Sequence, residues 1–205
     1  MKQQMFLLIL FVFSAIIGNS QAIEIGQKVP DVVLQQIINY EKPTLKLKDF
    51  KKKLVLLDFW GTGCKACIRG FPKMEALQKA FNDQIQIVLV NNESRDSTLR
   101  FFERRKSIPM PTLPMVTGDS ILSSFFPHLF VPLHVWLDED GIVRYITDSY
   151  NATAGNIRKF LDGKAPELSR MAYVANPYFS SLWDVVKDSS RQQQVYSYTL
   201  LTPWY

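Results

Sequence analysis

The only two cysteines of the chain, Cys64 and Cys67, lie where an apolar run ends and a helical pattern begins. The run, Leu54 to Phe59, is apolar at every position except Asp58, which is typical of a strand buried on both faces of a parallel sheet. A helix N-terminus after Cys64 offers unpaired N–H groups and the positive end of the helix dipole, and both stabilise a thiolate. The first cysteine is therefore predicted to be exposed and nucleophilic. The second, one turn into the helix, can close a disulfide onto it.

Apolar runs, turn residues and capping residues along the rest of the chain alternate between strand and helix patterns. They predict strands at 54–59, 85–90, 133–137 and 142–147 and helices at 64–82, 94–106, 120–126 and 153–161. The order strand, helix, strand predicts a right-handed crossover between parallel strands. Two short runs ahead of the core, 31–38 and 44–47, predict an added β-hairpin. The chain is therefore expected to have an α/β fold.

Further motifs accompany the cysteine pair on both sides. They are Ile25-Gly26 and Pro30-Asp31 before the core, Asp58-Phe59-Trp60 at the strand end, Phe71-Pro72 in the helix, and Phe130-Val131-Pro132 ahead of the run LHVWLD. Together with the cysteines, these motifs resemble the thioredoxin superfamily, in particular the exported TlpA/ResA-type thiol-disulfide oxidoreductases of the redoxin, or AhpC-TSA-like, branch. The resemblance runs from Ile25 to Leu161. It implies a thioredoxin-like fold, with a central mixed β-sheet flanked by helices and the added N-terminal β-hairpin.

The resemblance also implies an enzyme that exchanges disulfides with protein substrates. Cys64 would attack the substrate disulfide, and Cys67 would resolve the mixed disulfide with Asp58 as its proton acceptor. Burial beneath the disulfide favours the protonated form of a carboxyl group, which suits Asp58 to that role. Substrate contacts are assigned to Val131, Pro132, Trp60 and Gly63. A cis Pro132, as in the family, would place the Val131 backbone beside the disulfide to pair with an extended peptide, although local sequence alone favours trans.

Two positions depart from the family pattern. Gly63 precedes the first cysteine where the family usually has an aromatic residue, so the cover over the site is predicted to be smaller. Gly70 stands three residues after the second cysteine, where many TlpA/ResA-type members have a glutamate, so the proton-transfer role is assigned to Asp58 alone. Lys65, between the cysteines, favours the thiolate and hence the oxidising direction. The resemblance favours reduction driven by a membrane-bound electron donor, and reduction is our prediction.

Residues 1–22 have the pattern of a secretory signal peptide. A short positive start precedes an apolar run from Met5 to Ile17, and Ser20-Gln21-Ala22 offers small residues for cleavage. The run is shorter than the ~20 residues of a comfortable membrane span, so an uncleaved membrane anchor is the less favoured alternative. The chain is therefore expected in the periplasm or cell envelope after cleavage near Ala22.

Two parts follow the predicted signal peptide. Residues 23–163 carry the predicted thioredoxin-like domain, and 164–205 form a C-terminal extension that contains three prolines and two of the four tryptophans. Within the extension, 179–186 predicts a short helix and 195–201 a strand. The extension lies outside the resemblance, and its sequence assigns it no role.

The charge pattern gives no sign of a nucleic-acid partner. The 24 lysines and arginines exceed the 19 acidic residues by five, but the chain has no nucleic-acid motif and no basic patch interleaved with aromatic residues. Six lysines between positions 42 and 53 form a basic run. We interpret this run as a solvated hairpin edge, with an acidic partner or anionic lipid as the alternative.

Two other function classes stay open. A thioredoxin-like scaffold with an inert disulfide would be a binding module, and the reduction potential of the cysteine pair separates this class from an enzyme. A metallochaperone could combine the cysteines with His128 or His134, but no third clustered ligand is evident, so structural histidines are favoured. His134, two residues after Pro132, is predicted near the site, where it could tune Cys64. The sequence predicts no cofactor and no metal, and it leaves the oligomeric state open.

Overall fold

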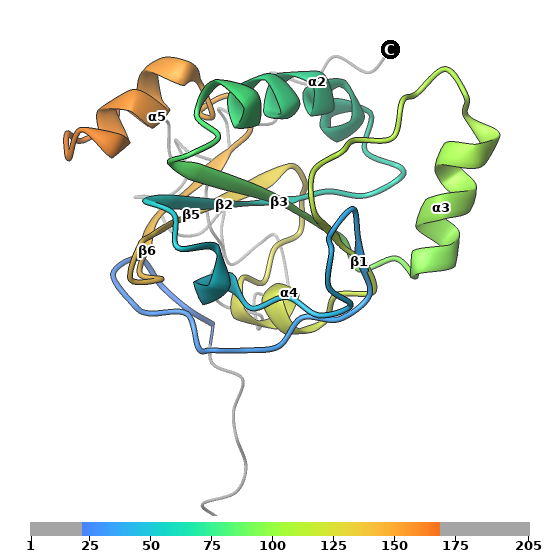
Figure 1. Ribbon diagram of the computed structural model, residues 1–205, viewed down its shortest axis with the longest axis horizontal. Helices are drawn as coiled ribbons and strands as arrows, with labels where there is room; N and C mark the ends of the chain where they lie inside the picture. Colours follow the sequence, from blue (N-terminus) through green and yellow to red (C-terminus); the bar gives the residue numbers. More distant parts are fainter. Residues whose placement is uncertain (1–21, 169–205) are drawn as a thin grey trace, which may run out of the picture.

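The computed structural model describes residues 22–168. The predicted signal peptide up to residue 21 lies outside the described residues, as does the extension from residue 169 with its predicted helix and strand. The described chain forms one mixed six-stranded β-sheet with helices on both faces (Figure 1). The α/β class predicted from the sequence is confirmed.

The central strand of the sheet leads directly to the cysteines. The strands are β1 (Ile37–Ile38), β2 (Leu54–Phe59), β3 (Ile85–Val90), β4 (Met115–Val116), β5 (Leu133–Asp138) and β6 (Val143–Asp148). Their order across the sheet is β1-β4-β3-β2-β5-β6. β3 is parallel to β2 and β4, whereas β5 is antiparallel to β2 and β6, and β1 is antiparallel to β4. β2 therefore lies between a parallel and an antiparallel neighbour.

Helices cover both faces of this sheet. They are the 3₁₀ helix η2 (Leu47–Phe50) and the α-helices α2 (Lys65–Ala80), α3 (Arg95–Arg104), α4 (Ile121–Phe125) and α5 (Ala154–Leu161). In Figure 1, α2 and α5 lie on one face, η2 and α4 lie on the other, and α3 lies beside the β1 end. α3 and α5 begin at capping side chains, since Ser94 and Thr153 accept the N–H groups of Ser97 and Asn156. These caps satisfy donors that the first helical turn leaves unpaired.

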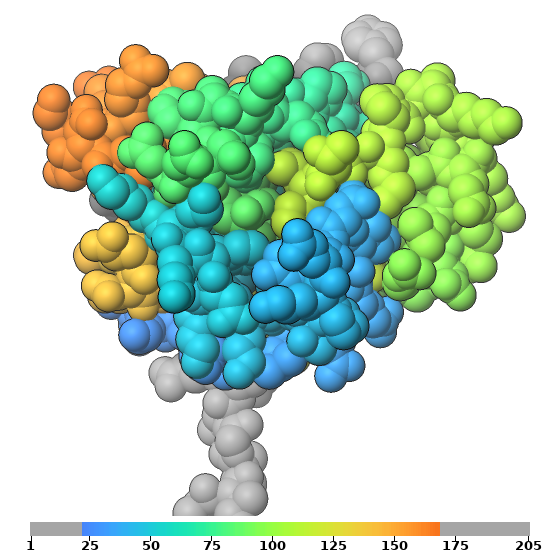
Figure 2. Space-filling model, in the orientation of Figure 1, coloured from blue at the N-terminus to red at the C-terminus, as the bar shows by residue number. Residues whose placement is uncertain are grey.

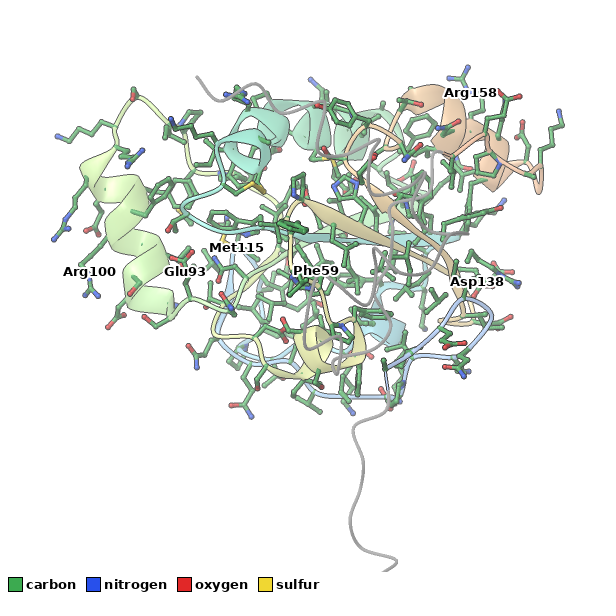
Figure 3. All side chains as sticks on the ribbon, turned by 180° about the vertical axis from the view of Figure 1, so that it is seen from behind. Phe59, Glu93, Arg100, Met115, Asp138 and Arg158 are labelled. Carbon is green, nitrogen blue, oxygen red and sulfur yellow. A yellow bond between two sulfur atoms is a disulfide. The ribbon has the colours of Figure 1, made fainter. Side chains whose placement is uncertain are left out.

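The side chains of β2 alternate between two apolar layers. Leu57 and Phe59 belong to the layer on the α4 side, and Leu54 and Leu56 belong to the layer on the α2 side. Phe59 appears near the middle of the molecule in Figure 3. Every residue of β2 is buried, as expected for a strand with helices on both faces. The α2-side layer also contains Trp136 of β5, which has no exposed surface.

The N-terminal hairpin is shorter than predicted. Leu34 and Leu45 exchange two backbone hydrogen bonds of 2.8 and 3.0 Å, but the pairing does not extend beyond this bridge. Gln36 and Asn39 have φ angles of 54° and 57° on either side of β1. These left-handed conformations turn the chain away from the second arm, and β1 pairs instead with β4 at the sheet edge. Figure 2 shows this N-terminal segment (blue) packed against the body of the domain.

Candidate active site

The disulfide between Cys64 and Cys67 lies at the N-terminus of α2, one short loop after β2. The S–S bond is 2.12 Å long and the two Cα atoms are 5.3 Å apart. Cys64 is the N-cap residue of α2 and is half-buried. Cys67, in the first helical turn, is only 4% exposed. One sulfur is therefore accessible and the other is covered.

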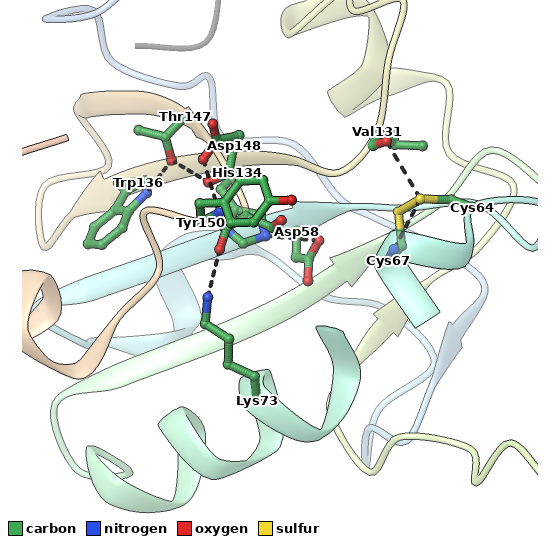
Figure 4. A network of polar contacts seen from close by, with 11 residues as sticks. Asp58, Cys64, Cys67, Lys73, Val131, His134, Trp136, Thr147, Asp148 and Tyr150 are labelled. Atoms are coloured by element: carbon green, nitrogen blue, oxygen red, sulfur yellow. Dashed lines mark hydrogen bonds and ion pairs between the residues drawn. A yellow bond between two sulfur atoms is a disulfide. The ribbon is translucent and has the colours of Figure 1, made fainter. Parts of the chain in front are cut away.

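Two backbone groups contact the Cys64 sulfur. The N–H of Cys67 points at Sγ with an N···S distance of 3.1 Å, and the carbonyl oxygen of Val131 lies 3.5 Å from Sγ (Figure 4). Once the disulfide is reduced, the N–H and the positive end of the α2 dipole favour the thiolate, whereas the carbonyl oxygen favours the protonated thiol. The N–H contact is the shorter one and the helix dipole adds to it. The balance therefore favours the thiolate.

The loop before β5 reaches the disulfide through a cis peptide bond between Val131 and Pro132. This is the isomer that the family resemblance implied and that local sequence did not favour. The two residues ahead of it, Leu129 and Phe130, are 74% and 70% exposed although both are large and apolar. The accessible sulfur therefore adjoins an exposed apolar loop.

Gly63 and Trp60, both predicted to contact substrate, lie in different environments. Gly63 is exposed, and a Cβ atom added there would meet nothing within 4 Å, so the space above this residue is open. Trp60 is only 2% exposed, and its ring centroid lies 5.0 Å from Phe71 and 6.0 Å from Phe102. The Trp60 side chain is thus a core residue that supports the loop from beneath. It does not offer the surface for a substrate that the resemblance assigned to it.

Asp58 is buried beneath α2. It is 4% exposed, and His134 of β5 is its cross-strand partner. Because successive strand side chains alternate between faces, Asp58 points the same way as Leu56 and Trp60, which share the α2-side layer with Cys67. Figure 4 shows Asp58 between His134 and the disulfide. The carboxylate is therefore on the side of the sheet that holds the covered cysteine.

Lys73 of α2 is a charged neighbour that the sequence analysis missed. Its Nζ donates a hydrogen bond to the Ser149 carbonyl oxygen at 2.8 Å. Burial lowers the pKa of Lys73, and the nearby carboxylates of Asp148 and Asp58 act in the opposite direction. Asp58 therefore has a cation within its electrostatic reach. A single lysine on a helix gave no sequence signal that would distinguish it from a solvent-facing one.

Glu93, also missed by the sequence analysis, holds the loop that precedes Cys64. Its Oε1 accepts the backbone N–H of Thr62 at 2.7 Å, and its Oε2 accepts the Thr62 hydroxyl at 2.8 Å. Glu93 follows the carboxyl end of β3, the parallel neighbour of β2, and lies beside α3 in Figure 3. Parallel strands end at the same edge of a sheet, so the position of Glu93 three residues after the predicted strand 85–90 could have indicated that it lies near the loop before Cys64.

Replacing Glu93 with alanine should lower the free energy of unfolding by about 1–2 kcal/mol, because two hydrogen bonds to a charged group are lost. Urea denaturation measures the change. Glu103→Ala, at an exposed position on α3, is the matched control and should stay within about 0.5 kcal/mol of the parent. Equal, small changes for both variants would show that the Glu93 contacts do not stabilise the loop.

The two histidines lie on opposite faces of the sheet. The His128 ring centroid is 4.9 Å from that of Phe59, and its Nδ1 is 2.7 Å from the Phe126 carbonyl oxygen. His134 faces Asp58 rather than Cys64. Between residues 22 and 168, no group of three or more His, Cys, Asp and Glu side chains could hold a metal ion. The same stretch contains no helix that is long and apolar enough to cross a membrane.

Comparisons with known proteins agree with this geometry. The AhpC/TSA family model matches residues 25–146, more than half of the chain. Thioredoxin-like protein YneN of Bacillus subtilis (strain 168) is 32% identical over 124 residues, which cover 60% of this chain and 71% of YneN. Thiol-disulfide oxidoreductase ResA of Geobacillus kaustophilus (strain HTA426) is 30% identical over 163 residues, which cover 76% of this chain and 86% of that protein.

A solved structure supports the fold independently. A thiol:disulfide interchange protein from Bacteroides sp. superposes with a TM-score of 0.52 at 23% identity, covering 69% of this chain and 92% of that one. At this identity the likeness is evidence of a shared fold only. The solved structure therefore shows the thioredoxin-like fold, and the matched family model shows that this chain belongs to the AhpC/TSA family.

Proposed function

We propose that this protein is a thiol-disulfide oxidoreductase that reduces disulfides in other proteins outside the cytoplasm. Cys64 is the attacking thiolate, Cys67 is the resolving thiol, and Asp58 accepts the proton of Cys67. The observation that carries the proposal is the asymmetry of the cysteine pair. One sulfur is half-exposed at a helix N-terminus, and the other is 4% exposed on the side of the sheet that holds a buried carboxylate. Relatives named thiol-disulfide oxidoreductase support the reaction class.

The exchange proceeds in two balanced steps. The Cys64 thiolate attacks one sulfur of the substrate disulfide, a Cys64–substrate disulfide forms, and the other substrate sulfur leaves and takes a proton. Cys67 then loses its proton to Asp58 and attacks the Cys64 sulfur, which forms the Cys64–Cys67 disulfide and expels the second substrate sulfur as a thiolate that takes a proton from solvent. Two electrons pass from the protein to the substrate. A membrane-bound donor would return them, and a leader removed near Ala22 would deliver the chain to its compartment.

Substrate binding is assigned to the loop that contains the cis peptide bond. The Val131 backbone lies beside the accessible sulfur and can pair with an extended peptide, as in strand addition. Leu129 and Phe130 add exposed apolar surface next to it. The open space at Gly63 leaves room for a folded or bulky substrate segment. We propose Val131, Pro132 and Gly63 as substrate contacts on these grounds, with Trp60 supporting the loop from the core.

The equilibrium reduction potential of the Cys64–Cys67 pair, measured on the purified protein in dithiothreitol or glutathione buffers, tests the proposal. A value near that of thioredoxin, about −270 mV, is expected for a reductase. A value near about −120 mV would reverse the proposed direction and identify an oxidant. A pair too stable to titrate would instead indicate an inert disulfide and a binding module.

The two thiols of the reduced protein should react at different rates with iodoacetamide. Cys64 should be alkylated first, because its sulfur is accessible and its thiolate is stabilised, whereas Cys67 is covered. Mass spectrometry of peptides after short exposures measures both rates. The same reaction in concentrated urea is the control, since unfolding removes the difference in exposure. Equal rates in the folded protein would remove the assignment of Cys64 as the attacking thiol.

A further inference from the structure

Asp58 and His134 form a buried pair of titratable groups across β2 and β5. His134 is 1% exposed and Asp58 4%, and the imidazole Nε2 lies 3.2 Å from the carboxylate Oδ1. Among the described residues, neither Asp58 Oδ1 nor either ring nitrogen of His134 has a hydrogen bond of good geometry. A buried polar group without a hydrogen bond costs about 1–3 kcal/mol of stability. The pair is therefore expected to lower the stability of the fold relative to apolar residues in the same layer.

Asp58 is the acidic side chain within ion-pair distance of the His134 imidazole. Thr147, the partner of His134 on β6, accepts a hydrogen bond from the Trp136 indole N–H at 3.1 Å. From α2, the Lys73 ammonium faces Asp148 at the end of β6 as well as Asp58. Cys67 of α2 lies in the same layer. In Figure 4, Asp58 lies between His134 and the disulfide that holds Cys67, and Lys73 and Asp148 lie on the His134 side.

We propose that His134 is a positioning residue that acts through Asp58, so that the pair, rather than the carboxylate alone, receives the proton lost by Cys67. This inference rests on the role proposed for Asp58 above. A neutral imidazole beside a carboxylate has room for one more proton in either tautomer. When Cys67 attacks the Cys64 sulfur, its proton moves to the pair and is shared between Oδ1 and Nε2. The proton returns to solvent after the disulfide has formed.

The sharing lowers the cost of proton transfer in a buried site. Without His134, the proton would convert an isolated buried carboxylate to its neutral acid with no partner for the new O–H group. With His134, that O–H donates to Nε2, or the proton passes to the imidazole and leaves an imidazolium–carboxylate pair. Either arrangement pairs polar atoms that lack hydrogen bonds in the oxidised protein. The resolving step is therefore expected to need both residues.

A double-mutant cycle at Asp58 and His134 tests this inference. The rate of resolution of a preformed mixed disulfide between Cys64 and a thiol reporter is followed in the parent, His134→Gln, Asp58→Asn and the double variant. His134→Gln should slow resolution about tenfold at pH 7 and alter its pH profile. In the Asp58→Asn background the same change should have no further effect, because residues that act as a unit are not additive. His128→Gln, on the other face of the sheet, is the control and should resolve at the parent rate.

The outcomes separate this inference from the proposed function. No resolvable mixed disulfide in the parent would contradict the proposed function itself. Slow resolution in Asp58→Asn together with a parent-like rate in His134→Gln would overturn only the role of His134. An undiminished effect of His134→Gln in the Asp58→Asn background would show that His134 acts independently of Asp58 and would also overturn it.

Proton NMR of the parent protein gives a second test that needs no variant at the pair. The chain has only two histidines, and His128→Gln assigns their signals. At pH 7 the ring signals of His134 should change chemical shift between the oxidised and reduced forms, whereas the ring signals of His128 should stay in place. His134 signals that are the same in both redox states would overturn the inference even if His134→Gln failed to fold.

Discussion

Replacing Cys64 with serine should abolish disulfide reduction. The serine hydroxyl stays protonated at neutral pH, and only a thiolate attacks a disulfide sulfur at a useful rate. The contacts that stabilise a thiolate at this position, the Cys67 N–H and the α2 dipole, cannot deprotonate a hydroxyl group to a useful extent. Insulin reduction in the presence of dithiothreitol, followed by turbidity, measures the loss. Activity should fall to the rate of dithiothreitol alone.

The matched variant Cys67→Ser separates attack from resolution. Cys64 keeps its thiolate in this variant, so it should still form a mixed disulfide with substrate, but no thiol is present to release it. Non-reducing electrophoresis should show a covalent complex that dithiothreitol cleaves and that Cys64→Ser does not form. A covalent complex formed by Cys64→Ser and not by Cys67→Ser would reverse the roles assigned to the two cysteines. Parent-like turnover by either variant would contradict a mechanism that uses both cysteines.

The sequence predicts most of the architecture because its signals are local. Strands 54–59 and 85–90 have the bounds observed for β2 and β3, since each is an apolar run interrupted by a single polar residue, Asp58 or Gln86. No strand was predicted at β4, and the residues of β1 were assigned to an arm of the hairpin. Both have only two residues, too few for any periodicity, and β1 reaches β4 through the positive-φ residues Gln36 and Asn39 on either side of it.

The site was predictable where one motif carries the chemistry. The cysteine pair, its place before a helix and the isolated acid in a buried strand could be read from sequence. Trp60 could not be placed, because whether the residue after a strand faces solvent or core depends on α3, whose Phe102 packs against it. The Asp58–His134 pair depends on the β2–β5 register, in which the two residues stand opposite one another. Asp58 and His134 are 76 positions apart in the chain, so no local sequence pattern indicates that they face one another.

The same register explains why the resolving cysteine meets a polar group in an apolar layer. Shifting β5 by one residue would turn His134 to the α4 side and leave Asp58 opposite an apolar side chain. Cys67 and Asp58 would then share a layer without the imidazole. The strand pairing that builds the core therefore also determines which groups are available to accept a proton.

Asp58→Asn should slow resolution of the mixed disulfide by about 100-fold at pH 7, because a positioned proton acceptor contributes about 10²–10⁴ to such a step. The amide has the shape of the carboxylate but cannot take a proton from Cys67. Stopped-flow measurement of thiol release after formation of the Cys64–substrate disulfide gives the rate. Asp83→Asn, at an exposed position after α2, is the matched control and should resolve at the parent rate.

Two further results would distinguish proton transfer from simple damage to the fold. Asparagine has the size of the aspartate side chain, and Asp58 Oδ1 accepts no hydrogen bond that the substitution would remove, so Asp58→Asn should unfold at about the same urea concentration as the parent. The kinetic deficit should also shrink as pH rises, because hydroxide removes the Cys67 proton increasingly well without Asp58. A deficit that is constant with pH, or a variant that unfolds more easily, would assign Asp58 to structure. A parent-like rate at pH 7 would remove it from the mechanism altogether.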